Sequence, residues 1–348
     1  MRIDGLLVVD KPEGITSLDV VREIKHRFFI KKAGHIGTLD PFATGVLPVA
    51  MNEGTKLIPF LKEDPKDYEA VMQIGEETRT DDLTGEIVER GPWEDLSPEI
   101  IRTVFKSFLG KIRQTPPMFS AVKVKGMPLY RMARRGIEIE REEREVQVYD
   151  LQVREIDLPM IHFRVSCSKG TYIRALARDI GKRIGCGAHL VSLRRTRSGI
   201  FTLEQAIPME RLKTLPGDEA LHSSLIPLSE VLFGLPEVIG DERLIRKVRY
   251  GKEMIVRDLD PQTLPPFEEG QWLKMSSPEE GLVAILQSAL RGGEIGKADP
   301  DRVALRPIRV FQPSPDPFPY RGRVRGKILF KSKEEFHGIC SGEEKRDH

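Results

Sequence analysis

The sequence has few of the features that mark secreted, zinc-binding or membrane proteins. Its 348 residues include only three cysteines, which lie far apart and form no CxxC pair, so neither a disulfide framework nor a zinc knuckle is expected. No stretch approaches the ~20 apolar residues that a membrane-spanning helix needs. No basic segment followed by an apolar run opens the chain, so we expect a cytoplasmic protein without membrane contact.

The motifs of common cofactor sites are missing as well. The chain contains no Gly-x-x-x-x-Gly-Lys phosphate loop and no His-Glu-x-x-His zinc motif. We therefore expect no nucleotide cofactor and no metal ion. The length and a hydrophobic content of 39% are sufficient for two domains, each with its own core.

The charge is nearly balanced overall but unevenly distributed. The net charge is only +2, yet residues 161–200 hold nine basic side chains and a single acidic one, Asp179. Such a segment attracts phosphates, although a solvated charged surface is an equally good interpretation of it. Residues 67–99 are acidic instead, with Asp81 and Asp82 among the clustered carboxylates, and we expect that segment to face away from a nucleic acid.

Hydrophobic patterns predict an α+β protein. A capping box at Thr16 begins one helix, and a second helix is predicted from Thr171 to a stop at Gly185. Alternating or β-rich runs predict strands at residues 6–9, 46–50, 68–74, 146–153 and 161–166. After Leu228 the pattern changes to short patches separated by Gly and Pro, which indicate a small β-barrel. Beyond Gln312 we expect a weakly ordered tail.

A carboxylate in a rigid turn stands out at Asp40, within the run GHIGTLDPFATGVLP from Gly34 to Pro48. Loops of this kind often display reactive side chains, so Asp40 is a candidate nucleophile. The alternative is an Asx-turn, in which an Asp before a Pro satisfies nearby backbone amides. Composition alone favours the turn.

Four segments in order carry a resemblance to a known family: KPEGITS from Lys11, GTLDPFATGVLP around Asp40, SKGTYIRALARDIG from Ser168, and GAHLVSLRRTRSG from Gly187. Together they resemble the TruB family of tRNA pseudouridine synthases. The short C-terminal patches are similar to the PUA-like RNA-binding domain of the bacterial members.

The resemblance implies a pseudouridine synthase fold, with a mixed, mostly antiparallel central sheet flanked by helices, and a PUA-like small β-barrel. It implies a catalytic domain at residues 1–230 with a thumb-like insertion at about 114–145, a PUA-like domain at 231–312 and a tail at 313–348. It also implies a monomeric enzyme that needs no cofactor and no protein partner. Its substrate would be the T-arm stem-loop of tRNA, in which it isomerises the uridine at position 55 after flipping the base.

Site residues are carried over from the same motifs. Asp40 is expected to act as the catalytic carboxylate, with Arg174 as its ion-pair partner and Tyr68 and Tyr172 against the uracil. Further substrate contacts are expected from His35, Leu193, Lys11 and Pro12. Candidate contacts to RNA phosphates are Arg178, Lys182, Arg194, Arg195 and Arg197.

Other classes of protein remain open from the sequence. An RNA-binding folding factor has no need of the set formed by Asp40, Tyr68, Tyr172 and Arg174. A guide-dependent pseudouridine synthase is not expected to carry the long insertion at about 114–145. A hydrolytic glycosidase requires a second acid to activate water, and the motif around Asp40 supplies none.

Overall fold

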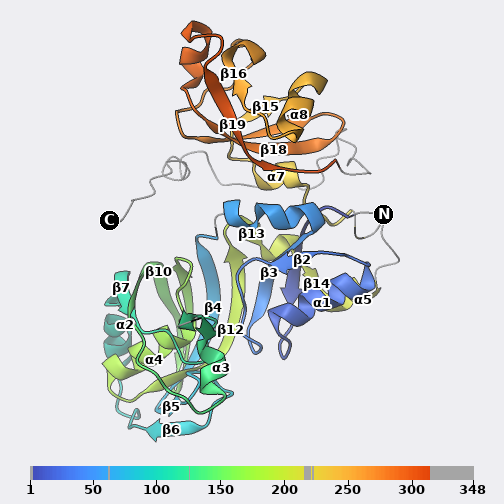
Figure 1. Ribbon diagram of the computed structural model, residues 1–348. Coiled ribbons are helices and arrows are strands. Elements are labelled where there is room, and N and C mark those ends of the chain that lie inside the picture. Colours follow the sequence, from blue (N-terminus) through green and yellow to red (C-terminus); the bar gives the residue numbers. More distant parts are fainter. Residues whose placement is uncertain (1–2, 62, 125, 215–220, 222, 314–348) are drawn as a thin grey trace.

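The computed structural model describes residues 3–61, 63–124, 126–214, 221 and 223–313. It contains a ten-stranded mixed sheet and a separate five-stranded sheet, which lies at the top in Figure 1. The predicted tail lies outside the described residues, except for Pro313. In the described part of the chain, no helix is long and apolar enough to cross a membrane.

The large sheet is mixed and mostly antiparallel, as predicted. Its main path runs β14-β1-β3-β12-β4-β11-β10-β7, with β13 on β12 and β2 on β3. The β1–β14 and β3–β12 pairs are parallel, and the others are antiparallel. The strands are β1 (Gly5–Lys11), β2 (Ala33–His35), β3 (Thr44–Met51), β4 (Lys66–Ile74), β7 (Gly110–Gln114), β10 (Arg144–Asp157), β11 (Met160–Cys167), β12 (Ala188–Ser198), β13 (Phe201–Thr202) and β14 (Ile207–Pro208).

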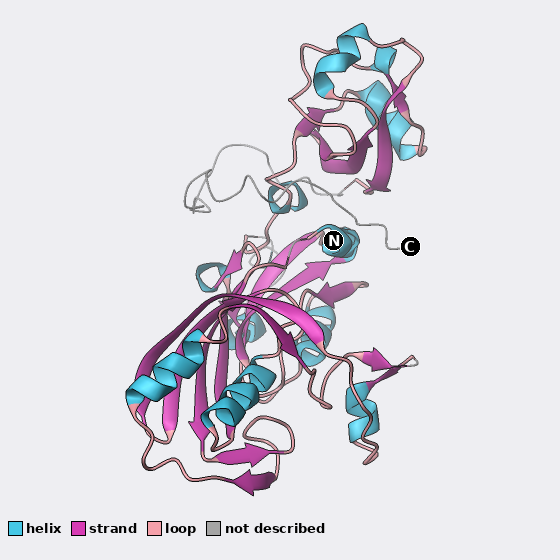
Figure 2. Ribbon diagram, turned by 90° about the vertical axis from the view of Figure 1, so that its left-hand side faces the viewer, coloured by secondary structure: helices cyan, strands magenta, loops and turns pink. Residues whose placement is uncertain are grey.

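Helices cover both halves of this sheet. Helix α4 packs on β12 and contacts α2, while α1 packs on β2 and contacts α5 (Figures 1 and 2). The helices are α1 (Ser17–Arg27), α2 (Pro98–Lys106), α3 (Leu129–Ala133), α4 (Ile173–Ile184) and α5 (Met209–Thr214). The predicted capping box of α1 is confirmed, with Thr16 and Asp19 as its members. The predicted stop of α4 is confirmed as well, since Gly185 adopts φ +100°, which favours glycine.

The thumb-like insertion leaves and re-enters the sheet at one place. Gln114, the last residue of β7, pairs with Arg144, the first residue of β10. Between them lie α3 and a hairpin of β8 (Lys123–Val124) and β9 (Met127–Pro128). A second hairpin, β5 (Glu76–Thr78) and β6 (Ile87–Arg90), extends beyond β4.

The C-terminal sheet is curled and has its own core. Its order is β15-β17-β18-β19-β16, and Val248, Leu273 and Leu286 are among its buried residues. A further cluster joins it to the large sheet, because Ile285 and Phe311 share a core with Leu6. The elements are the 3₁₀ helix η1 (Asn52–Phe60) at this junction, α7 (Leu228–Val231), β15 (Glu237–Ile239), α8 (Glu242–Arg249), β16 (Met254–Ile255), β17 (Trp272–Ser277), β18 (Gly281–Ser288) and β19 (Val303–Val310).

Strand β12 is the main element that the sequence patterns did not predict. It occupies the middle of the large sheet, between β3 and β4. Its burial alternates, with Leu193 and Arg195 buried and Arg194 between them partly exposed. Such alternation is the signature of a strand, but basic residues on both faces hid it. This omission affects the site directly.

Candidate active site

The Asp40 carboxylate lies in the loop between β2 and β3, and it makes an ion pair rather than an Asx-turn. Its Oδ2 accepts from Arg174 Nε at 2.8 Å and its Oδ1 accepts from Arg174 Nη2 at 3.1 Å. In the described residues, neither oxygen accepts from a backbone amide of its own loop. The side chain of Asp40 keeps 32% of its surface exposed. The predicted pair of Asp40 and Arg174 is therefore confirmed, and the paired carboxylate still faces solvent.

Arg174 is buried and every part of its guanidinium is engaged. Its side chain is 3% exposed and lies on the first turn of α4. Besides Asp40, Nη1 donates to the carbonyl of Thr80 and Nη2 to that of Phe119, each at 2.8 Å. Nη1 also lies 3.4 Å from Asp82 Oδ2. A bidentate guanidinium held at this many points fixes the direction of the carboxylate.

Asp82 is a second carboxylate behind the pair, and the sequence reasoning missed its place. It is 4% exposed, and its Oδ1 accepts from the hydroxyls of Thr80 and Thr84 at 2.6 Å and from the amide of Thr84 at 3.0 Å. Burial raises the pKa of Asp40, Arg174 opposes that shift, and Asp82 adds to it. The Thr-Asp-Asp-Leu-Thr run indicates a turn, but nothing in the sequence connects it with Arg174.

Two residues of the acidic segment lie against arginines of the basic one. Asp82 faces Arg174, and Asp81 Oδ2 lies 2.8 Å from Arg178 Nη1. Both carboxylates therefore neutralise arginines of α4. Charge clusters that are distant in the sequence can meet in the fold, because a buried charge requires a partner.

Two buried cations hold the Asp40 loop in place. Lys11, at the end of β1, is fully buried, and its Nζ donates to the carbonyls of Pro12, Ile15 and Pro41 at 2.9, 2.7 and 3.1 Å. Burial lowers the pKa of Lys11 to about 8, and the Asp40 carboxylate opposes this shift. Three donors on three carbonyls match the geometry of an ammonium group. Lys11 thereby links the backbone at Pro12 to the backbone at Pro41, the residue that follows Asp40.

Arg195 is the other buried cation, and its position corrects a prediction. It is 0% exposed, and it donates to the carbonyls of Val46, Thr38 and Gly37 at 2.8, 3.3 and 2.9 Å. Its guanidinium is thus enclosed by the loop that presents Asp40. The chain passes close here, since a Cβ on Gly45 would lie 2.2 Å from the carbonyl oxygen of Arg195. Arg195 cannot contact an RNA phosphate, because no solvent-facing donor remains.

The two tyrosines lie within the electrostatic influence of Asp40. Tyr68 on β4 is 7% exposed, and burial raises its pKa to about 12, with Arg195 opposing and Asp40 adding to the shift. Tyr172, directly before α4, is half-buried, and burial followed by Asp40 raises its pKa as well. Both hydroxyls are therefore neutral at physiological pH.

The remaining predicted substrate contacts surround the same region. Leu193 on β12 is 6% exposed and belongs to the main core. It stands opposite Ala70 of β4, two residues beyond Tyr68. His35 on β2 is partly buried, its Nδ1 has no hydrogen-bond partner among the described residues, and burial lowers its pKa. The ring is neutral, and its unpartnered nitrogen is buried.

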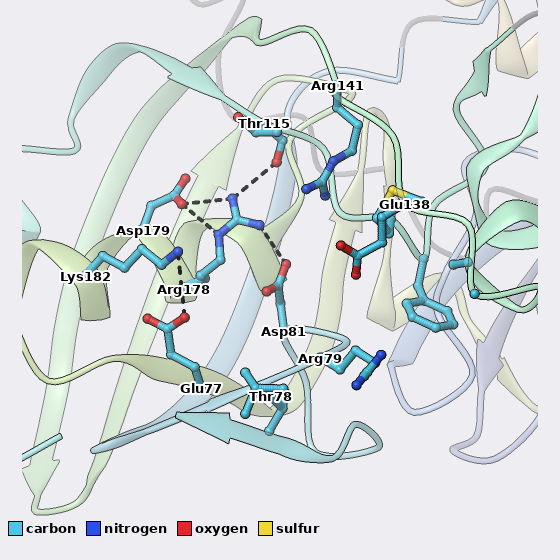
Figure 3. Close-up of a pocket in the computed structure, with 15 residues that line it drawn as sticks. Glu77, Thr78, Arg79, Asp81, Thr115, Glu138, Arg141, Arg178, Asp179 and Lys182 are labelled. Carbon is cyan, nitrogen blue, oxygen red and sulfur yellow. Dashed lines mark hydrogen bonds and ion pairs between the residues drawn. The ribbon is translucent and has the colours of Figure 1, made fainter. Parts of the chain in front are cut away.

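A cavity of about 840 Å³ adjoins the pair, beneath the thumb. Figure 3 shows Arg178 in its wall with hydrogen bonds and ion pairs to Asp81, Asp179 and Thr115. Thumb residues Glu138 and Arg141 line the opposite side. Phe119, which also lines this cavity, gives its carbonyl to Arg174. The cavity and the Asp40 site therefore share a wall.

The other four predicted phosphate contacts differ in how far their side chains are exposed and in how many protein partners they have. Arg178 is 14% exposed and fully engaged by its partners, which leaves little for an outside phosphate. Arg194 pairs with Asp10 and Arg197 with Asp67, and these two side chains remain 38% and 39% exposed. Lys182 is 58% exposed, with Glu77 at 3.7 Å. These last three remain predicted RNA contacts.

Gln114 is another residue that the sequence reasoning did not single out. It is 2% exposed and contacts the backbone of Tyr172. No signal in the sequence distinguishes it from an ordinary strand residue. The described residues also contain no group of three or more His, Cys, Asp or Glu side chains placed to hold a metal ion.

Comparison with known proteins agrees with this geometry. A family model described as TruB family pseudouridylate synthase (N terminal domain) matches residues 25–173, and one described as tRNA pseudouridylate synthase B C-terminal domain matches residues 174–233. The protein named tRNA pseudouridine synthase B of Geobacter sulfurreducens is 46% identical over 309 residues, which cover 89% of this chain and 100% of that protein. Its namesake in Syntrophus aciditrophicus is 43% identical over 313 residues, covering 89% and 99% of the two chains.

Solved structures show the same architecture. The crystal structure of a Cbf5-Nop10-Gar1 complex contains a chain that matches with a TM-score of 0.65 and 30% identity, covering 89% of this chain and 85% of that one. A structure of an H/ACA RNP bound to a substrate RNA containing 2′-deoxyuridine matches with a TM-score of 0.65 and 28% identity over the same shares. The curled C-terminal sheet fits the PUA-like domain that the sequence predicted. On its sequence, its relatives and its fold, the chain belongs to the TruB family of pseudouridine synthases.

Proposed function

We propose that this enzyme converts uridine to pseudouridine in the T-arm loop of tRNA, at position 55, with Asp40 as its catalytic carboxylate. The observation that carries the proposal is the bidentate pair of Asp40 and Arg174, in which the arginine is 3% exposed and the aspartate 32% exposed. A carboxylate that is both fixed and reachable suits attack on a bound nucleoside. The name tRNA pseudouridine synthase B, carried by the relatives, supports tRNA as the substrate.

The reaction conserves composition and electrons. The bond from N1 of uracil to C1′ of ribose breaks, the ring turns, and a bond from C5 to C1′ forms. C5 then loses a proton and N1 gains one, so we propose that no cofactor takes part. Asp40 can begin this sequence by attack on C1′, by addition to C6 of uracil, or by taking a proton from the sugar. Each route requires the ionised carboxylate, which Arg174 favours.

The neighbouring side chains receive roles from the same proposal. Tyr68 stacks on the flipped uracil, and Tyr172 lies near C5, where the proton departs. Leu193 lines the pocket beside the ring, and His35 fills the space that flipped bases vacate or contacts the RNA. Lys11 and Pro12 support the wall of the pocket through the carbonyls that Lys11 binds.

RNA recognition is assigned to the exposed cations and to the C-terminal domain. Arg194, Arg197 and Lys182 are partly or largely exposed, and we propose that they contact phosphates of the T-arm. The proposed catalytic domain covers residues 1–230 and the PUA-like domain 231–312. We further propose that the enzyme works as a cytoplasmic monomer without a protein partner, and that it also assists tRNA folding.

One specific observation keeps a second function in view. The structural matches include proteins solved in complexes named Cbf5-Nop10-Gar1 and H/ACA RNP, which raises guide-dependent modification as an alternative. The insertion between β7 and β10 favours stand-alone recognition, because it closes over the cavity beside the Asp40 pair. A third alternative, an RNA-binding folding factor, has no need of the pair between Asp40 and the buried Arg174, or of the buried Asp82 beside it.

The test is carbodiimide mapping of pseudouridine in an unmodified tRNA transcript treated with the pure protein alone. An isolated T-arm stem-loop and an anticodon stem-loop serve as matched substrates. We expect one modified uridine, in the T-loop, in both the full transcript and the T-arm. Modification that appears only when a guide RNA is added would replace this proposal with the guide-dependent one, and tight binding without modification would favour the folding factor.

A further inference from the structure

Gln114 occupies the point where the thumb joins the sheet. It is the last residue of β7, it pairs in register with Arg144 of β10, and its side chain is almost fully buried. A buried amide must satisfy its donor and its acceptor. The partners of this amide lie outside the sheet, 58 residues further along the chain.

The side chain of Gln114 forms a reciprocal pair with the backbone of Tyr172. The amide of Tyr172 donates to Gln114 Oε1 at 2.8 Å, and Gln114 Nε2 donates to the carbonyl of Tyr172 at 3.0 Å. The polarity of the backbone determines which end of the amide is oxygen and which is nitrogen. Two hydrogen bonds from one rigid group fix both the position and the rotation of the peptide that they contact.

Tyr172 depends on this support. It precedes the first residue of α4, with φ −95° and ψ 110°, and its own side chain does not cap the helix. The amide groups at the start of a helix have no partner within the helix. Gln114 therefore binds the residue at which the chain turns from β-like backbone into α4, two positions before Arg174.

The residues after Gln114 bind the same helix. The carbonyl of Thr115 accepts from Arg178 at 3.2 Å, and the carbonyl of Phe119 accepts from Arg174 at 2.8 Å. Three residues at the base of the thumb, Gln114, Thr115 and Phe119, thus make hydrogen bonds to α4 or to the residue just before it. Movement at the base of the thumb would act on Tyr172 first, because Gln114 makes the contact nearest to the sheet.

We infer that Gln114 is a positioning residue for catalysis, which orients Tyr172 toward the uracil held beside Asp40. The inference rests on the proposed function and goes beyond it, since it places the base of the thumb within the catalytic apparatus. A purely structural role for Gln114 would affect folding and leave the chemistry of the folded enzyme unchanged. Substitution by an isosteric acid separates the two roles.

The experiment compares Gln114→Glu with the wild-type enzyme in single-turnover assays on the T-arm stem-loop across a pH series. An ionised carboxylate accepts from the amide of Tyr172 but repels its carbonyl, whereas the protonated acid restores both hydrogen bonds. Burial raises the pKa of a carboxyl at this position, and the cross-strand Arg144 opposes that shift. We expect a rate at neutral pH about 10- to 100-fold below wild type, with unchanged RNA affinity, and recovery of the ratio to wild type as the pH falls.

Two further variants make the result decisive. Gln114→Leu can restore neither hydrogen bond, so its ratio to wild type should stay low at every pH. Gln152→Glu makes the same substitution at an exposed position of β10 and should follow the wild-type profile. If Gln114→Glu proves unstable, protection of the Tyr172 amide from hydrogen exchange in wild type and in Gln114→Asn gives the second measurement, with loss of protection expected in the variant.

The outcomes separate this inference from the proposed function. Wild-type enzyme that forms no pseudouridine would overturn the function itself. Suppose instead that the wild type is active and that Gln114→Glu and Gln114→Leu have the same activity per folded molecule at every pH. That result would overturn only the positioning role. A full rate in Gln114→Leu would do the same.

Discussion

Arg174 on α4 and Arg195 on β12 are both buried cations, but the groups that they bind differ. Arg174 binds the carboxylate of Asp40 and lies beside that of Asp82. Arg195 binds the carbonyls of Gly37, Thr38 and Val46 and lies beside the Tyr68 hydroxyl, where it opposes the rise in the pKa of that tyrosine. One arginine therefore orients the proposed catalytic carboxylate, and the other shapes the loop that carries it.

The difference shows that the partner of a buried charge determines its role. A guanidinium on a carboxylate changes the ionisation and direction of that carboxylate. A guanidinium on carbonyls satisfies backbone acceptors and contributes mainly to folding. Arg194, next to Arg195 on the strand, is 38% exposed and belongs to neither class. The four predictions below separate these roles.

Of these four, the largest effect is expected from Arg174→Lys. A lysine keeps the charge but cannot make the bidentate contact, so the direction of the carboxylate is lost. We predict a single-turnover rate about 100-fold below wild type, with unchanged affinity for the T-arm stem-loop. A rate within threefold of wild type would show that the fork geometry is unnecessary.

The next effect is a loss of activity in acid. Burial raises the pKa of Asp40, and the proposed reaction requires its ionised form. Activity should therefore be complete well above the raised pKa and fall about tenfold per pH unit below it, with a midpoint above that of an ordinary aspartate. Circular dichroism at each pH confirms folding. A midpoint below 3.8, the ordinary value, would contradict the account.

A smaller effect on rate is expected from Arg195→Lys, the matched variant of the first prediction. Three donors can still reach some of the three carbonyls, so the loop persists with weaker bonds. We predict a loss of roughly 1–3 kcal/mol in the free energy of unfolding and a rate per folded molecule within a few-fold of wild type. Equal loss of rate in Arg174→Lys and Arg195→Lys would break the comparison.

The smallest effect is expected from Arg194→Ala. Its ion pair with Asp10 is partly exposed, and pairs of that kind contribute about 0–1 kcal/mol to stability. We predict unchanged stability, a modest loss of RNA affinity, and a salt dependence of binding reduced by about one phosphate contact. Titration of the T-arm stem-loop at several salt concentrations measures this. An unchanged salt dependence would remove Arg194 from the interface.

The sequence predicted the local parts of the site and missed those that depend on long-range pairing. Motif context identified Asp40 and Arg174, and turn chemistry located the end of α4 at Gly185, whereas the helix begins at Ile173, two residues after the predicted start at Thr171. The roles of Arg194 and Arg195 were not separated, because β12 was not recognised as a strand. Alternation along a strand places neighbouring side chains on opposite faces, and it would have separated these two.

Asp82 and Gln114 could not be predicted for a different reason. Each acts through a contact with a residue more than fifty positions away, Arg174 or Tyr172. Propensity and periodicity describe only neighbours in the chain. The fold had to place the turn at Asp82 and the end of β7 against α4 before their purpose became visible.

The most direct test of the account is the single-turnover formation of pseudouridine by Asp40→Asn. This variant is nearly isosteric and keeps a polar group beside Arg174, but it has no carboxylate. The measurement uses the T-arm stem-loop at saturating enzyme, with RNA affinity determined in parallel. We predict a rate at least about 1,000-fold below wild type with undiminished binding. Turnover by Asp40→Asn at the wild-type rate would contradict the central claim that the Asp40 carboxylate drives the isomerisation.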